Sequence, residues 1–540
     1  MPLKRFAAAL AATLLAAGAA NAQQTLVYCY EASPETLLPM QALGQSTFDA
    51  NLQMYNTLVE MERGSTKLIP ALAESWTISD DGLVYTFKLR RGVKFHSNAE
   101  FKPSREMTAD DVLFTFHRQM NPEHPFHKVG GRGYGLFVGY GLDKLIKSVD
   151  KVDDTTVRFT LSGKRAAFLQ MLTIGNLSIV SAEYHEKSMA AGNPDRPALN
   201  PIGTGAFEFV AYQKDAMLRF RAFRDHWARS APAMQDRTAK VDNLVMAIVT
   251  DPTVRYQKLV AGECHVMRFP NPADMQAMKA NPQLEVQIIP GLDYAFYGYN
   301  VQKPPFGDKR VRQAMNLAIN KQAIRDLIFQ DGIFGQPMGG VIPPGLLGYD
   351  DSIKPYPEDV EKAKRLLVEA GFPNGFKTTM WAMPVVRAYM PNARRTAELM
   401  QSDLKRIGVE VEIVTVEWAE YLRRTQQGEH ETVILGWNYG YADPGAILEL
   451  GWTCEGARNG LNRSRWCNEA YDRAVFGAAE ITDEAERIKL YRQAQDVFQE
   501  EAPALLVAYA SKIAVARKEV EGFKLVPAGA QPLYGVGLKR

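Results

Sequence analysis

Four short segments contain residue types that catalyse reactions or bind metals and phosphates. His124-Pro-Phe-His127 has the spacing of two metal ligands, but its proline breaks helical geometry and no acidic or cysteine partner is evident. Gly131-Arg-Gly-Tyr-Gly135 is similar to a phosphate loop, but it lacks the third glycine spacing and no strand leads into it. The pairs Asp110-Asp111 and Asp350-Asp351 lie at helix starts or turns, where carboxylates need no catalytic role. We interpret these motifs as turns and loops.

Motifs of nucleophilic or zinc-dependent hydrolysis are also missing. The sequence has no Gly-x-Ser-x-Gly elbow and no His-Glu-x-x-His. This favours a binding protein over an enzyme, and we expect no metal site and no cofactor. An exported hydrolase stays a remote alternative.

The N-terminus has the pattern of a secretory signal peptide. Lys4 and Arg5 precede an uncharged run over 6–19, and Ala20-Asn-Ala22 supplies small residues before a cleavage site. The run is too short to cross a bilayer comfortably, which takes about 20 residues. We expect export to the periplasm with cleavage after Ala22, so that the mature chain starts at Gln23.

Four cysteines occur in the chain: Cys29, Cys264, Cys454 and Cys467. An even number in an exported chain indicates two disulfides, for which three connectivities exist. Local pairing of Cys454 with Cys467 would leave Cys29 with Cys264. Buried free thiols are the alternative.

Composition limits the classes of partner. The chain has 63 basic and 61 acidic residues, which are intermixed, and a formal net charge of +2. This balance argues against a nucleic-acid or membrane-surface partner. The length of 540 residues indicates at least two domains of ordinary size.

Periodicity predicts an α/β protein. Strands are expected near 25–30, 83–89, 157–161, 207–210, 218–223, 409–414 and 433–437. Helices are expected from Thr108 and over 310–327, 359–370, 393–407 and 484–501, with Gly371 and Gly408 as C-terminal stops. Alternation of helices and strands after about residue 290 indicates a sheet flanked by helices.

An ordered series of motifs resembles the large solute-binding proteins of bacterial ABC importers for peptides, nickel and opines, and most of all the periplasmic dipeptide binders. The series includes Ala71-Leu-Ala-Glu-Ser-Trp76, Thr108-Ala-Asp-Asp-Val112, Asn200-Pro-Ile-Gly-Thr-Gly205, Trp381-Ala-Met-Pro384 and Pro391-Asn-Ala-Arg-Arg395. The resemblance covers essentially the whole mature chain. It implies the disulfides Cys29–Cys264 and Cys454–Cys467.

The resemblance also implies a two-lobed periplasmic-binding-protein (type II) fold with an extra subdomain in the larger lobe. The larger lobe would use residues 23–290 and 511–540, and the smaller lobe residues 291–510. A small-molecule ligand would lie in the cleft between the lobes. Closure would exclude water, strengthen charged hydrogen bonds and present a shape that a membrane permease recognises.

In dipeptide binders an arginine after Trp-Ala-Met-Pro holds the ligand carboxylate, and the matching residue here is Arg387. A guanidinium grips a carboxylate through two parallel hydrogen bonds. Tyr389 matches a site tyrosine, and Trp437 and Tyr439 would shape the cleft. A surface salt bridge is the alternative role for Arg387.

One departure from the family concerns the ligand's amino group. The aspartate that normally holds it is replaced by Gly440, and Asp443 could compensate although it more often has a structural role before proline. A buried ammonium without a carboxylate is costly. We therefore expect plain dipeptides to bind weakly and Gly440→Asp to improve their binding.

The sequence thus predicts a periplasmic, monomeric, non-enzymatic component of an ABC importer that binds peptide-like ligands. The alternative ligand is a carboxylated metabolite such as a modified amino acid, an opine-like or a haem-like molecule. A second role as a chaperone or chemoreceptor adaptor stays open.

Overall fold

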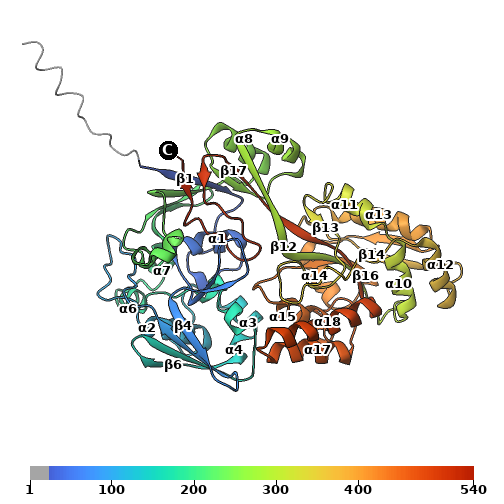
Figure 1. Ribbon diagram of the computed structural model, residues 1–540, viewed down its shortest axis with the longest axis horizontal. Helices are drawn as coiled ribbons and strands as arrows, with labels where there is room; N and C mark the ends of the chain where they lie inside the picture. Colours follow the sequence, from blue (N-terminus) through green and yellow to red (C-terminus); the bar gives the residue numbers. More distant parts are fainter. Residues whose placement is uncertain (1–22, 540) are drawn as a thin grey trace, which may run out of the picture.

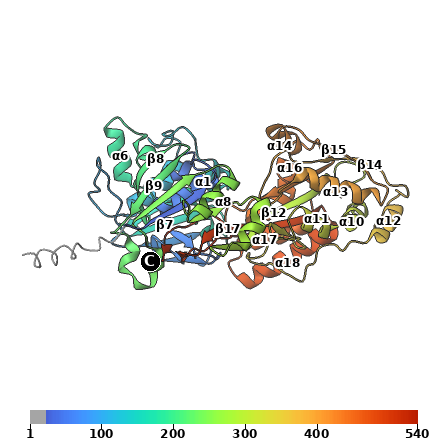
Figure 2. The same ribbon diagram turned by 90° about the horizontal axis from the view of Figure 1, so that it is seen from above.

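The computed structural model describes residues 23–539, so the predicted signal peptide lies outside the described residues. Two bodies lie side by side and are joined by the long strands β12 (Leu284–Tyr299) and β17 (Ala504–Arg517), as Figures 1 and 2 show. We call residues 23–283 with 518–539 the N-terminal body and residues 300–503 the C-terminal body. The C-terminus of the chain lies in the N-terminal body, close to β1 (Figure 1).

One 11-stranded sheet runs through both bodies of the described chain. Its order is β15 (Glu410–Val414), β14 (Lys377–Trp381), β16 (Thr432–Trp437), β12, β17, β11 (Val266–Arg268), β1 (Thr25–Tyr30), β10 (Asn243–Ile248), β9 (Met217–Ala222) and β8 (Phe207–Gln213), while β13 (Gly335–Gln336) pairs with β17 beside this path.

The two crossing strands are antiparallel partners and their register shifts between the bodies. Pro290 pairs with Ser511, and pairing resumes with Tyr294 opposite Tyr509. The lobe boundaries expected at 290/291 and 510/511 fall at this irregularity, and the lobe division itself stays a prediction. A break in a ladder locally bends the strands, which suits a connection between two bodies.

A second sheet lies wholly within the N-terminal body and accounts for the additional subdomain. It consists of four antiparallel strands in the order β4 (Ala73–Ile78), β5 (Val84–Leu89), β7 (Thr156–Leu161) and β6 (Ile146–Asp153). Helix α2 (Ala109–Met120) packs beside it and starts as predicted. Thr108 and Asp111 form its capping box, in which each side chain meets the other residue's backbone amide.

Most predicted helices of the C-terminal body are present, but the helix expected over 310–327 is two helices. α10 (Lys309–Ala318) ends, and Asn320 then caps α11 (Lys321–Leu327) by accepting a hydrogen bond from the Ala323 amide at 2.8 Å. An asparagine side chain that bonds its own backbone competes with a continuous helix, which the hydrophobic periodicity does not reveal.

The remaining helices pack around the sheets. In the N-terminal body they are α1 (Gln45–Met54), α3 (Gly135–Gly139), α4 (Leu142–Leu145), α5 (Phe168–Met171), α6 (Ala182–Ala190), α7 (Arg196–Leu199), α8 (Pro252–Ala261) and α9 (Met275–Ala280). In the C-terminal body they are α12 (Val360–Glu369), α13 (Ala393–Lys405), α14 (Trp418–Gln426), α15 (Gly445–Trp452), α16 (Cys454–Asn459), α17 (Glu469–Glu480) and α18 (Glu484–Glu501).

Both predicted disulfides are present. Cys29 of β1 bonds to Cys264 with a Cα–Cα distance of 5.8 Å, and Cys454 bonds to Cys467 with a Cα–Cα distance of 4.3 Å. The first therefore ties β1 to the segment that leads into β11, and the second closes a short loop after α15.

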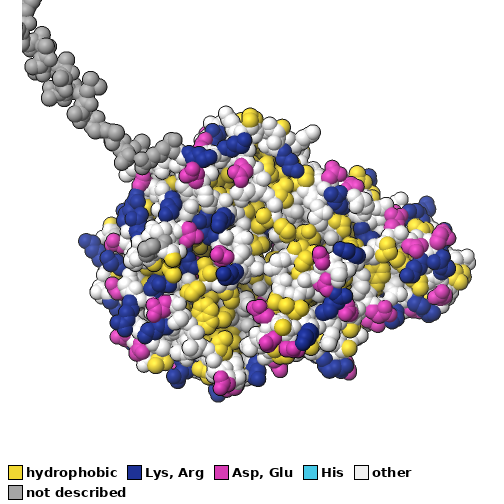
Figure 3. Space-filling model, in the orientation of Figure 1, with side chains coloured by type: hydrophobic (Ala, Val, Ile, Leu, Met, Phe, Trp, Pro, Cys, Tyr) yellow, Lys and Arg dark blue, Asp and Glu magenta, His cyan; other side chains and the backbone are white. Residues whose placement is uncertain are grey.

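The surface carries charges of both signs without a single-sign field on the face seen in Figure 3. Lysine and arginine side chains alternate there with aspartate and glutamate side chains (Figure 3). This agrees with the near-neutral net charge of the sequence.

Candidate functional site

The parallel pairing of β14 with β16 brings the predicted site residues to one edge of the sheet. Met380 pairs with Thr432 and Trp381 with Val433, so both strands end at the same edge. Arg387 and Tyr389 lie in the loop after β14. Trp437 ends β16, and Tyr439, Gly440 and Asp443 lie in the loop that leads to α15. Loops after the carboxyl ends of parallel strands are where α/β sheets commonly bind ligands.

Arg387 is half-buried and is held by an aromatic ring. Its guanidinium carbon lies 5.0 Å from the centre of the Trp418 ring, and its Nη1 donates to the Val386 carbonyl at 3.0 Å. A guanidinium has five N–H donors in a planar fork. Stacking restricts the side chain while most of these donors stay free for a carboxylate.

Tyr389 is the link between Arg387 and β16. Its ring covers Gly436 so closely that a β-carbon at Gly436 would lie 2.4 Å from Tyr389 Cδ2. Burial raises the pKa of Tyr389 to about 12, and the charge of Arg387 opposes this shift. The phenol is therefore neutral at physiological pH and available as a hydrogen-bond donor beside the guanidinium.

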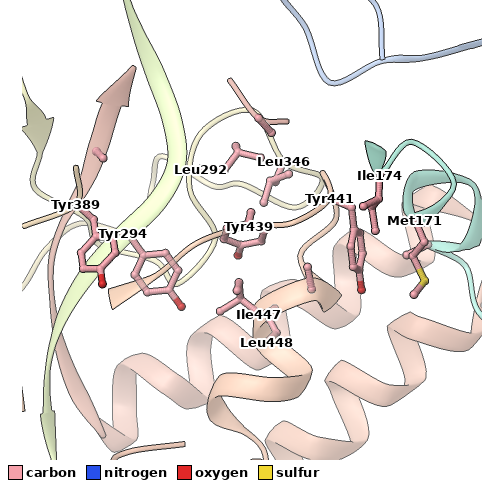
Figure 4. Packing of buried hydrophobic residues seen from close by; sticks show 14 of the residues in the cluster. Met171, Ile174, Leu292, Tyr294, Leu346, Tyr389, Tyr439, Tyr441, Ile447 and Leu448 are labelled. Atoms are coloured by element: carbon pink, nitrogen blue, oxygen red, sulfur yellow. The ribbon is translucent and has the colours of Figure 1, made fainter. Parts of the chain in front are cut away.

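Trp437 and Tyr439 are packed into the C-terminal body and each has an unused polar atom. Trp437 lies against Gly451 of α15. Trp437 Nε1 and the Tyr439 hydroxyl are buried and have no hydrogen-bond partner within residues 23–539. The Tyr439 amide donates to Asp293 Oδ1 at 3.2 Å, and the Tyr439 ring lies 6.4 Å from that of Tyr294. Figure 4 shows Tyr389, Tyr294, Tyr439 and Tyr441 in a row along this edge.

Asp443 is engaged in a buried network within the C-terminal body. Its Oδ2 accepts from Arg487 Nη2 at 2.7 Å, and its Oδ1 accepts from the Gly445 amide at 2.9 Å and the Tyr491 hydroxyl at 3.3 Å. The side chains of Asp443 and Arg487 are 2% and 4% exposed. With both oxygens engaged, Asp443 orients the loop at the start of α15, and its predicted contact with a ligand stays untested.

Gly440 meets the N-terminal body directly. A β-carbon on Gly440 would lie 1.6 Å from the hydroxyl oxygen of Tyr140, the residue after α3. A side chain at Gly440 therefore requires Tyr140 to move, and the expectation that Gly440→Asp improves dipeptide binding stays a prediction that depends on this movement. Sequence reasoning could not foresee this contact between residues 300 positions apart.

A cavity of about 140 Å³ lies at this contact. Tyr439 and Gly440 line it from the C-terminal body, and Tyr140, Ile174 and Glu60 are among the N-terminal residues that line it. Figure 4 shows Ile174 and Met171 facing Tyr441 across the two bodies. Arg387 and Asp443 do not line this cavity.

Polar contacts also join the bodies around the cavity. Arg165 forms an ion pair with Glu449 of α15, and the Ala166 amide donates to the Ala479 carbonyl at 2.7 Å. On another side the Thr66 hydroxyl donates to the Gly345 carbonyl at 2.9 Å. These contacts hold the two bodies together over the cavity.

The residues that sequence reasoning missed belong to the crossing strands and to the opposite body. Asp293 of β12 forms a 2.7 Å ion pair with Lys512 of β17 and accepts from Tyr439, so it ties the crossing strands to the site loop. Tyr140 lies within a glycine-rich stretch, 130–141, in which Gly130, Gly131, Gly133 and Gly141 have positive φ. That cluster of glycines was the available signal of an unusual loop.

A family model described as bacterial extracellular solute-binding proteins, family 5 Middle, matches residues 67–459. The chain belongs to this family. The dipeptide-binding protein of Escherichia coli (strain K12) is 44% identical over 517 residues, which cover 96% of this chain and 95% of that protein. Heme-binding protein A of Haemophilus influenzae is 42% identical over 521 residues, which cover 96% and 93%.

Solved structures support the same fold. HbpA2 from Haemophilus parasuis superposes with a TM-score of 0.91 at 41% identity, covering 96% of this chain and 100% of that chain. The periplasmic binding protein DppA from Helicobacter pylori, in complex with the peptide STSA, has a TM-score of 0.78 at 34% identity and covers 96% and 98%. The protein has the type II periplasmic-binding-protein fold predicted from its sequence.

Within residues 23–539, no helix is long and apolar enough to cross a membrane. The same residues contain no group of three or more His, Cys, Asp or Glu side chains placed to hold a metal ion.

Proposed function

We propose that this protein is the periplasmic component of an ABC importer and binds small peptide-like ligands that carry a free carboxylate. The observation that carries the proposal is the parallel pairing of β14 with β16, because the loop with Arg387 and Tyr389 and the 437–443 loop both start at that sheet edge. Tyr140 of the opposite body meets the second loop at Gly440. Arg387 grips the carboxylate, and Tyr389, Trp437 and Tyr439 shape the cleft. The family and the peptide bound to the Helicobacter relative support this function.

The binding cycle needs only closure of the two bodies around the bend in β12 and β17. Closure removes water from the ligand's carboxylate and from Arg387, which strengthens their charged hydrogen bonds. The closed shape then differs from the open one, and a membrane permease recognises it. The protein is exported with cleavage after Ala22, acts as a monomer and catalyses no reaction.

Ligand identity and the role of Arg387 are tested together. Ligand released from the denatured periplasmic protein is identified by mass spectrometry, and calorimetry then measures its binding to the ligand-free wild type and to Arg387→Ala. We expect a loss of about 30- to several-thousand-fold in affinity, because a desolvated carboxylate loses its bidentate partner.

Arg394→Ala is the matched control, since Arg394 is a surface residue that pairs with Glu398 on α13. Its affinity should equal that of the wild type. A ligand without a carboxylate, or an Arg387→Ala variant that binds as tightly as the wild type, would contradict the proposal.

The second candidate ligand is a non-peptide carboxylated metabolite. The chain is 42% identical to heme-binding protein A, and this similarity supports a non-peptide ligand as the second candidate. The cavity of about 140 Å³ beside Gly440 is small for a macrocycle such as haem. The mass spectrum of the released ligand separates this candidate from a peptide.

A further inference from the structure

The contact between Tyr140 and Gly440 decides which chemistry one end of the cavity offers to a ligand. Any side chain at Gly440 would collide with Tyr140, whose hydroxyl oxygen is 1.6 Å from the place of a β-carbon. The Tyr140 ring is itself positioned by an edge contact with Tyr441, with ring centres 5.5 Å apart. Tyr140 of the N-terminal body therefore supplies a hydroxyl as the polar group beside Gly440.

The Tyr140 side chain is neutral and lines the cavity beside Gly440. Burial raises the pKa of Tyr140 above its usual value, so the phenol keeps its proton at neutral pH. A phenol in this state donates one hydrogen bond and accepts others, but it carries no charge that could balance an ammonium.

The carboxylates near the cavity already have partners. Each is bonded to a cation, an amide or a hydroxyl: Glu60 to Asn56 with Arg237 at 3.9 Å, Asp293 to Lys512, Asp443 to Arg487 and Glu449 to Arg165. A ligand ammonium that enters this space would lose its water without gaining an unpaired anion. That loss is expensive in a desolvated site.

We propose that Tyr140 makes this cleft selective for small ligands whose amino nitrogen is acylated, so that a neutral amide takes the place of a free ammonium. The Tyr140 hydroxyl donates to the acyl carbonyl or accepts from the amide N–H. This inference rests on the proposed function, in which Arg387 holds the other end of the ligand. Arg387 does not line the cavity, so the ligand extends from Tyr140 toward the loop after β14.

Two probes that differ only at the amino end test the proposal: Ala-Ala and N-acetyl-Ala-Ala. Calorimetry is performed on the ligand-free mature protein and on Tyr140→Phe, which keeps the ring and removes the hydroxyl. We expect the wild type to bind N-acetyl-Ala-Ala at least about tenfold more tightly than Ala-Ala. Tyr140→Phe should weaken binding of the acetylated probe by about 2- to 13-fold, the effect of one neutral hydrogen bond, and leave Ala-Ala unchanged.

Tyr349→Phe is the matched control, because Tyr349 is 44% exposed and lies outside the cavity lining. It should bind both probes like the wild type, and melting curves verify that both phenylalanine variants fold. As a reciprocal test, the double variant Tyr140→Ser with Gly440→Asp has room for the new carboxylate. It should bind Ala-Ala more tightly than the wild type does.

Tight wild-type binding of Ala-Ala would overturn the proposal. If Glu60→Gln then removes that binding, the ammonium is held by Glu60, and if Arg387→Ala also removes it, the proposed function survives while the selectivity is wrong. Binding of neither probe would overturn both the selectivity and the peptide-like function. An unchanged affinity of Tyr140→Phe for the acetylated probe would show that its hydroxyl does not touch the ligand.

Discussion

Removal of the Asp443 carboxylate should destabilise the C-terminal body, because Arg487 would be left as an unpaired buried charge. Asp443 and Arg487 are 2% and 4% exposed, and their ion pair is 2.7 Å long. In Asp443→Ala, Arg487 keeps the Ala478 carbonyl and the Tyr491 hydroxyl, two uncharged partners. Breaking a buried pair on one side costs about 3–5 kcal/mol of unfolding free energy.

Two further variants separate the effect of losing the Asp443 charge from the effect of losing its packing. Asp443→Asn keeps the shape and one acceptor, so we expect a smaller loss of about 1.5–3 kcal/mol. Replacing both residues, as in Asp443→Ala with Arg487→Met, removes both charges and should lose less than Asp443→Ala alone. A double-mutant cycle then gives the coupling energy of the pair.

Urea unfolding of the ligand-free mature protein measures these changes. Asp496→Ala is the matched control on α18, the helix that carries Arg487. The Asp496–Arg492 pair is exposed and should contribute about 1 kcal/mol or less to the unfolding free energy. A loss below about 1 kcal/mol in Asp443→Ala would refute the reasoning. If that variant also lost ligand binding without losing stability, Asp443 would be a ligand contact and not a loop anchor.

Two further predictions concern the disulfides and acid stability. Replacing Cys454 and Cys467 with serine opens a loop of sequence separation 13 and should lower the unfolding free energy by about 3 kcal/mol, measured by urea unfolding under non-reducing conditions. Equal stability of oxidised wild type and variant would contradict this. Burial lowers the pKa of four histidines strongly, to about 4 for His96 and His430 and to about 3 for His185 and His226. The unfolded chain takes up their protons near pH 6.5, so stability is complete above pH 6.5 and falls toward pH 4, by about 1.4 kcal/mol per pH unit for each histidine. Melting temperatures at pH 7 and pH 5 measure the loss, and a flat profile would show that these rings protonate in the folded state.

Local signals predicted the elements that depend on neighbouring residues. The predicted capping residue Thr108 starts α2, and Gly371 and Gly408 follow the ends of α12 and α13 with positive φ, as their positions in the sequence indicate. The break at Asn320 was missed, because hydrophobic periodicity continues across it while the side chain caps a new helix. The site edge could be predicted only through the resemblance to a family.

The sequence by itself determined the family, the positions of most strands and helices and the identity of the groups in the 437–443 loop, and the resemblance to the family supplied both disulfides. Each of these depends on a local pattern or on an ordered series of motifs along the chain. Tertiary structure alone decided that Asp443 is paired with Arg487 and that Tyr140 lies over Gly440. The physical reason is that both contacts join residues far apart in the chain, and burial between packed elements, which no local pattern encodes, determines which polar groups stay free for a ligand.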